Sequence, residues 1–80
     1  MSDITTKIFR ESLNKIVLVQ LKGGRTVRGK MSSFDQHMNL VLEDAEDVSE
    51  SETVKKLGTL IVRGDNIVLL SPPPNRGDNP

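Results

Sequence analysis

The sequence predicts a small, mainly β domain, in which an N-terminal helix precedes five short antiparallel strands that form a strongly bent open barrel. Three observations lead to this fold class. Apolar residues recur at helical spacing near the N-terminus, alternating apolar runs follow, and glycine-containing turns separate those runs. Short strands with glycine bends favour a curled barrel over a flat sheet.

The composition limits how such a domain can be stabilised. A chain of 80 residues is one small domain, and domains of this size bury only about 60% of their unfolded surface. Without cysteine there is neither a disulfide nor a thiolate zinc site, and a single histidine argues against a metal-dependent fold. Oligomerisation is the support that remains.

Charge and hydropathy restrict the classes of function. Eleven basic and eleven acidic residues cancel, so a global electrostatic footprint for nucleic acid is absent and any anion binding must come from local placement of charge. No apolar run is long enough to span a bilayer, and the N-terminus has no signal-peptide core. We therefore expect a cytoplasmic protein that does not interact with membranes and carries no cofactor.

Residues 3–13 are expected to form the helix. Ile4 and Ile8 lie four positions apart, and Phe9 and Leu13 are close to the same stripe. Ser2 or Asp3 can accept a hydrogen bond from a free backbone N–H at the helix start. The helix is expected to pack on the sheet through this stripe.

The first two strands are expected over residues 16–21 and 26–34. In the run IVLVQL, alternate residues face the core, and Gly23-Gly24 supplies the positive φ angles that a tight hairpin requires. The second run, TVRGKMSSF, contains Gly29 among its inward-facing positions. A glycine inside a strand indicates strong bending or a close backbone approach.

Three more strands are expected after the turn DQHM. NLVLED points Leu40 and Leu42 inward, and the charged residues 45–56 are interpreted as an exposed connecting loop. LGTLIV and IVLLS form the fourth and fifth strands, with the turn RGDN between them, in which Gly64 tolerates a positive φ. Residues 72–80, rich in proline, are expected to be an extended, flexible tail.

An open barrel leaves two sheet edges with unpaired backbone groups. The fifth strand, NIVLL, has no lysine or inward charge to prevent pairing with another chain. If the two edges are complementary and the rotation closes, head-to-tail pairing yields a ring. The fold thus offers the oligomeric support that the size of the chain calls for.

Two segments resemble the two motifs of the Sm and Sm-like (LSm) proteins. The first, within residues 16–44, is VLVQLKGGRTVRGKMSSFDQHMNLVLED, and the second, within residues 57–70, is LIVRGDNIVLL. The residues that carry the resemblance are Gly24, Gly29, Asp35, Met38 and Asn39 in the first motif and Arg63-Gly64 in the second. The bacterial branch, Hfq, lacks this form of the second motif. Residues 1–71 therefore look most like a single Sm-like domain of the archaeal type.

The resemblance implies the Sm fold, an SH3-like barrel. It also implies a ring, usually of seven subunits, closed by pairing the fourth strand of one chain with the fifth strand of the next. Members of this type bind uridine-rich single-stranded RNA at the inner rim of the pore and act as RNA chaperones or scaffolds. Carried over to this chain, His37 and Arg63 stack on a base, Asn39 reads its edge, Asp35 holds Asn39 in place, and Gly64 and Asp65 line the pocket.

The chemistry of uracil agrees with these roles. Its N3–H donor and carbonyl acceptors match the C=O and NH₂ groups of Asn39, whereas cytosine has no N3–H. Guanidinium and imidazole planes can both stack on bases. Arg63 is the best candidate for a cation directed into the pore, and Lys22, Arg25, Arg28 and Lys30 are assigned to outer surfaces.

Three other interpretations compete with RNA binding. Asp35, His37 and Asn39 are also ordinary turn residues. Asp35 with His37 could form a catalytic or metal-binding pair, but the sequence provides no placed nucleophile and no evident third ligand, so we expect no enzyme and no metal site. An SH3-like adaptor would need an aromatic groove for Pro-rich peptides, and Phe9 and Phe34 are the only aromatic residues besides the histidine.

Overall fold

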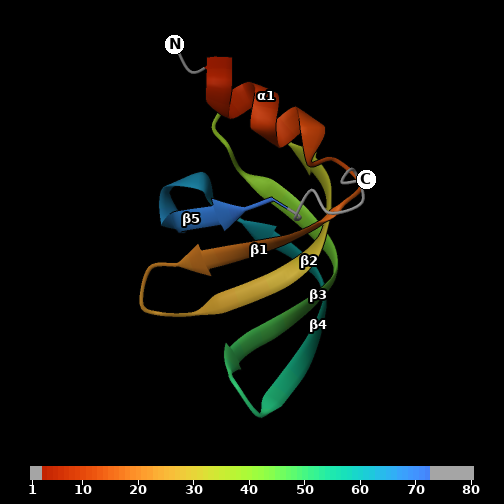
Figure 1. Ribbon diagram of the computed structural model, residues 1–80, viewed down its shortest axis with the longest axis vertical. Helices are drawn as coiled ribbons and strands as arrows, with labels where there is room; N and C mark the ends of the chain where they lie inside the picture. Colours follow the sequence, from red (N-terminus) through yellow and green to blue (C-terminus); the bar gives the residue numbers. More distant parts are fainter. Residues whose placement is uncertain (1–2, 73–80) are drawn as a thin grey trace, which may run out of the picture.

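The computed structural model describes residues 3–72 and shows one helix followed by a bent, five-stranded antiparallel sheet. The sheet order is β4-β3-β2-β1-β5, so β4 and β5 are the two edge strands (Figure 1). The elements are α1 (Asp3–Glu11), β1 (Ile16–Leu21), β2 (Thr26–Phe34), β3 (Leu40–Glu50), β4 (Thr53–Val62), the 3₁₀ turn η1 (Gly64–Asn66) and β5 (Ile67–Ser71). The predicted fold class is confirmed.

A row of small residues crosses the three longest strands at the place where the sheet bends. A Cβ on Gly29 of β2 would lie 3.1 Å from the Cα of Ala45 on β3. Ala45 pairs with Gly58 of β4, which has a φ of 78°, and Asp44 beside it has a φ of 53°. The register shifts on both sides of Ala45, as expected for β-bulges. The close approach predicted for Gly29 is therefore present.

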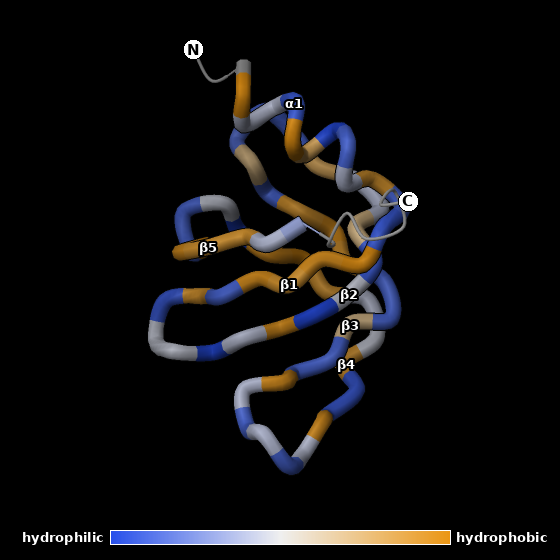
Figure 2. The backbone as a smooth tube through the Cα atoms, viewed as in Figure 1, coloured by the Kyte–Doolittle hydropathy of each residue, from blue (hydrophilic) through white to orange (hydrophobic). Residues whose placement is uncertain are grey.

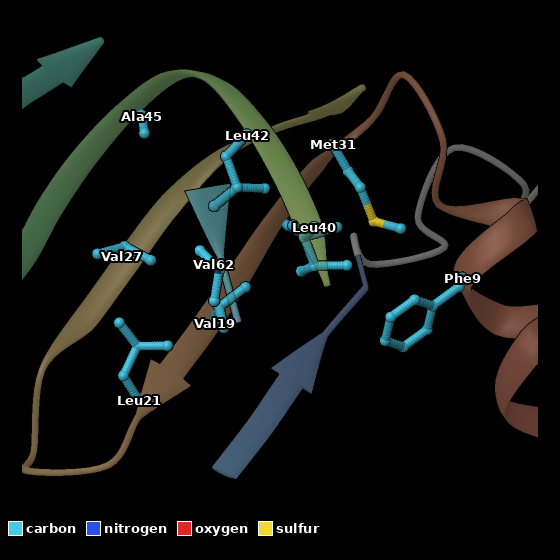
Figure 3. Close-up of a cluster of buried hydrophobic side chains, with 10 residues drawn as sticks. Phe9, Val19, Leu21, Val27, Met31, Leu40, Leu42, Ala45 and Val62 are labelled. Carbon is cyan, nitrogen blue, oxygen red and sulfur yellow. The ribbon is translucent and has the colours of Figure 1, made fainter. Parts of the chain in front are cut away.

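The core fills the inside of this curved sheet. Ten buried apolar residues form one cluster, and Met31, Leu40, Leu42 and Val19 are completely buried. Figure 3 shows side chains from β1, β2, β3 and β4 meeting at its centre, with Phe9 extending from α1 toward Met31. Phe9 also packs edge-to-face on Phe34, with ring centroids 5.4 Å apart. Phe9 is thus part of the core, and Phe34 packs against it.

The helix is shorter than predicted and buries less of its apolar stripe. It ends at Glu11 rather than at residue 13, and Asn14 then adopts a left-handed conformation with a φ of 67°. The expectation that the whole stripe faces the sheet is wrong for two residues, because Ile4 is 75% exposed and Ile8 is 38% exposed. The helix crosses one end of the sheet (Figure 1), so mainly its C-terminal part reaches the core.

The expected connecting loop over residues 45–56 is instead a long β-hairpin. β3 and β4 continue through this region and leave only a turn at Ser51-Glu52. Opposite charges face each other across the hairpin, where Glu46 pairs with Lys56 and Asp47 with Lys55. Within the tail predicted for residues 72–80, residues 73–80 lie outside the described part of the chain. No helix in residues 3–72 has the length and apolar character needed to cross a bilayer.

We predict that Gly29→Ala destabilises the domain, because its new methyl group would press on the backbone of β3. Overpacking of this kind costs about 1–3 kcal/mol. Urea unfolding followed by circular dichroism at a fixed protein concentration measures the loss, with the exposed β1 substitution Gln20→Ala as the control. A Gly29→Ala midpoint equal to that of the control would contradict the proposed crowding.

Candidate functional site

The turn between β2 and β3 is organised by one carboxylate. Asp35 Oδ1 accepts hydrogen bonds from the backbone N–H groups of His37, at 2.8 Å, and Asn39, at 3.0 Å. Backbone hydrogen bonds also join Asp35 N–H to the Asn39 carbonyl and Met38 N–H to the Asp35 carbonyl. A short acidic side chain that bonds the following backbone N–H groups is a common way to build a turn. The turn interpretation is therefore correct as far as local structure is concerned.

The same carboxylate fixes the side chain of Asn39. Asn39 Nδ2 donates to Asp35 Oδ2 at 3.0 Å, while Asn39 Oδ1 accepts from the backbone N–H of Gly64 at 2.7 Å. Since a carboxylate only accepts and a backbone N–H only donates, these two partners define which end of the amide is which. One Nδ2–H and one Oδ1 lone pair remain for a ligand.

Gly64 brings the second turn against the first. A Cβ at this position would collide with the backbone carbonyl oxygen of His37 and lie 2.9 Å from the carbonyl of Met38. Among the described glycines, those with a positive φ are Gly23, Gly24 and Gly58. The predicted reason for glycine at position 64, a positive φ, is therefore wrong. Close packing of the two turns requires glycine here.

A hollow of about 270 Å³ lies beside this contact. Its polar lining includes Asp35, Asn39 and Arg63, which the sequence had placed in one site. Apolar side chains complete it, among them Phe34 and the exposed Ile61. The structure thus joins a hydrogen-bonding amide, a guanidinium and apolar walls, which together suit a flat, polar ring.

Three of the predicted site residues, His37, Gly64 and Asp65, are placed less directly, because none of them lines this hollow. The His37 and Asp65 side chains are exposed and are not part of the lining of this hollow. His37 contributes its backbone to the turn contact, and Asp65 lies in η1 next to Gly64. The stacking roles of His37 and Arg63, the base reading by Asn39 and the pocket roles of Gly64 and Asp65 all stay predictions.

The backbone N–H of Gly64 and the left-handed Met38, with a φ of 63°, are the parts of the site that sequence reasoning missed. Neither has a side-chain signature, because one is a main-chain donor and the other is an apolar residue in an unusual conformation. The sequence could indicate the Gly64 contact only indirectly, through the expectation that the two motifs contribute to one site.

The hydrogen bonds to Asp35 lower the pKa of its carboxyl group. The largest cause is the bond from the Asn39 side chain, followed by the backbone N–H of Asn39, with further help from His37. Because the pKa is lower in the folded state, this interaction is fully present above the unfolded value of about 3.9. It is lost as pH falls through the folded value.

We therefore predict that acid releases the Asn39 amide. In NMR spectra, its side-chain NH₂ signals should move toward unstructured values as pH falls through the folded pKa of Asp35. The variant Asp35→Asn should show the released position at neutral pH, since an amide cannot accept all three bonds. Following Asn39 itself separates this event from titration of Asp47, whose pKa is also lowered. Signals that stay unchanged through the titration of Asp35 would contradict the arrangement.

Comparison with known proteins places this site in context. The model of the LSM domain matches residues 7–72. A Sm-like protein of Archaeoglobus fulgidus is 48% identical over 67 residues, which cover 84% of this chain and 87% of the relative. One of Thermococcus kodakarensis is 46% identical over 72 residues, covering 90% of this chain and 95% of the relative.

Solved structures agree with this result. A heptameric archaeal Sm protein has a TM-score of 0.79 at 46% identity, covering 85% of this chain and 98% of its own. The Sm protein of Pyrococcus abyssi, in complex with a uridine heptamer, has a TM-score of 0.79 at 43% identity, covering 85% and 96%. The resemblance of the two sequence motifs to the Sm motifs is thereby confirmed, and the chain belongs to the LSM-domain family of Sm-like proteins.

Proposed function

We propose that this chain forms a ring, a homoheptamer, that binds uridine-rich single-stranded RNA at the inner rim of its pore. It acts without catalysis, as an RNA chaperone or as a scaffold for ribonucleoprotein assembly. Support comes from two similar proteins, one of which is a heptamer and one of which is in complex with a uridine heptamer.

The oriented amide of Asn39 is the observation that carries the proposal. Asp35 and Gly64 hold one N–H and one lone pair of this amide, so one N–H and one lone pair remain for a ligand and the two ends of the amide cannot exchange places. Uracil presents the complementary pair, an N3–H donor next to a carbonyl acceptor. Cytosine in the same position turns its ring acceptor N3 toward Asn39 Oδ1, where uracil turns a donor, and the held amide cannot exchange its two ends to match it.

Stacking supplies the remaining affinity of each site. Arg63 lines the hollow beside Asn39, and its planar guanidinium can cover a base on one side. His37, on the adjoining turn, covers the other side. Each stacked base contributes about 1–3 kcal/mol, and repetition around a ring converts modest single sites into high avidity.

The two sheet edges support assembly. β4 and β5 are at opposite ends of the strand order, and both present exposed apolar side chains. Ile61 on β4 is 70% exposed, and Val68 and Leu69 on β5 are 59% and 56% exposed. Pairing β4 of one subunit with β5 of the next buries these residues and satisfies the free backbone groups.

For base recognition, we predict that wild-type protein binds oligouridine more tightly than oligocytidine in fluorescence anisotropy. Asn39→Ala should weaken oligouridine binding about 5- to 150-fold, the equivalent of about 1–3 kcal/mol for lost or unsatisfied hydrogen bonds. Gln36→Ala, an exposed residue of the same turn, is the matched control. Equal affinity for the two oligomers would rule out the proposed reading of uracil.

For assembly, we predict a mass near 62 kDa by light scattering, from seven copies of 8.9 kDa. Ile61→Lys and Val68→Lys place charges on the two pairing edges and should shift the protein toward monomer. Ile4→Lys is the control, because Ile4 is at least as exposed as the two edge residues but lies on the helix. Native mass spectrometry gives the stoichiometry with and without oligouridine. A wild-type monomer would contradict the ring, and a hexamer would contradict the sevenfold count.

A further inference from the structure

A second hollow, of about 440 Å³, lies between the β1–β2 turn and the β3–β4 hairpin. Three basic residues, Lys22, Arg25 and Lys55, line it together with Gly23 and Gly24. Both regions are mostly hydrophilic, as Figure 2 shows. None of these five residues belongs to the Asn39 site, so the hollow is a separate feature of the molecule.

One of the two acidic residues in this hollow serves to hold Arg25. Asp47 Oδ2 accepts from Arg25 Nε at 3.0 Å, and Asp47 Oδ1 accepts from the Ser49 hydroxyl at 2.6 Å and the Ser49 backbone at 2.9 Å. The Asp47 side chain is only 12% exposed, whereas that of Arg25 is 62% exposed. Asp47 is therefore occupied, and the outer N–H groups of Arg25 face solvent without a partner in residues 3–72.

The balance of charge in the hollow is positive. Beside the Arg25–Asp47 pair, Lys22 and Lys55 face a single further carboxylate, Glu50. Neither lysine forms an ion pair with another residue of the described chain. Two flexible ammonium groups and a held guanidinium are suited to bind a phosphate group.

The glycine turn leaves room for a ligand to approach the backbone. Gly23 and Gly24 have φ angles of 89° and 86°, and a Cβ added to either would meet nothing within 4 Å. The main chain here is exposed, and the N–H of Gly23 has no backbone partner among the described turn and loop contacts. A backbone N–H that is open to solvent beside basic side chains is a further donor for an anion.

A short connection links this hollow to the Asn39 site. The backbone N–H of Lys22 donates to the carbonyl of Asn66, the last residue of η1, at 2.9 Å. Arg63 precedes η1, and three residue steps span at most about 11 Å. One strand of nucleic acid can thus reach both places.

We propose that this hollow binds phosphodiester groups of the same RNA strand whose bases enter the Asn39 site. The identity of the ligand, RNA, rests on the proposed function. The ability of the hollow to bind phosphate rests on its own basic residues. The backbone carries no sequence information, so the hollow adds affinity without adding preference for uracil.

The salt dependence of binding tests this directly. Affinity for oligouridine is measured at several salt concentrations for wild type, for the double variant Lys22→Gln, Lys55→Gln, and for the control Lys7→Gln, Lys15→Gln, which removes two exposed lysines elsewhere. Loss of two phosphate contacts should reduce the slope of log K against log salt by about 1.4 for each subunit whose hollow the oligouridine occupies. The ratio of oligouridine to oligocytidine affinity should stay unchanged. A slope equal to that of wild type, or an equal reduction in the control, overturns the proposal.

A second measurement separates this hollow from the base site. NMR spectra of wild type and Asn39→Ala are recorded with an abasic phosphodiester oligomer and with inorganic phosphate. Shifts of the Gly23 and Gly24 signals with the oligomer in both proteins support the proposal. Equal shifts with inorganic phosphate indicate a site for free phosphate and overturn the assignment to a strand. No shift with either probe overturns it fully. If the Gly23 signal shifts with the abasic oligomer but the protein binds oligouridine and oligocytidine equally, the phosphate site stands and the base-reading role of Asn39 is rejected.

Discussion

The close approach of β2 to β3 at Gly29 and Ala45 is the constraint on which the rest of the molecule depends. A Cβ at Gly29 would lie 3.1 Å from the Cα of Ala45, which is closer than side chains usually pack, and the positive φ of Gly58 continues the bend into β4. A sheet curled at this row can enclose a core from one side. The curl also brings the end of β4 back to the beginning of the sheet, so that β5 pairs with β1.

The site is a consequence of that curvature. The turn after β4 lies on the turn after β2, and Gly64 allows the two backbones to touch. From this contact Asn39 obtains the N–H that orients its amide, and Asp35 supplies the opposite restraint. The amide of Asn39 is therefore held by one residue of its own turn and one of another, so little of its side-chain entropy would be lost in the proposed contact with a base.

The sequence predicted the features that depend on neighbouring residues, such as alternation within a strand and the residues that form a turn. The inward positions of β1 and β2, together with Leu40 and Leu42, follow from alternation, and the Gly23-Gly24 hairpin follows from turn chemistry. The length of β3 and β4 did not, because beyond the core β4 is exposed on both faces and β3 is half-buried without alternation, so there is no pattern to detect. The exposure of Ile4 likewise depends on where the helix crosses the sheet, which is a tertiary property.

The site was predictable to a similar degree. The two motifs identified Asp35, Asn39 and Arg63, and these three line one hollow. The hydrogen bond from Gly64 could not be derived, since any residue has a backbone N–H and only the packed turns select this one. The sequence also did not reveal that the basic residues fall into two groups with different surroundings. Arg28 forms an ion pair with Glu46 across two strands, whereas Arg25 and Lys22 face the second hollow.

The two edge strands differ in length, and this inequality constrains how copies of the chain can join. β4 has ten residues and β5 has five, so any pairing between them leaves at least five positions of β4 unmatched, 10 − 5 = 5. Toward the hairpin turn β4 carries Lys55 and Lys56, whose charges oppose a further strand. Toward Arg63 it carries Leu60 and Ile61. In the proposed ring, the apolar end of β4 would therefore set the pairing register, and the lysines would oppose the addition of a strand to the remainder of this edge.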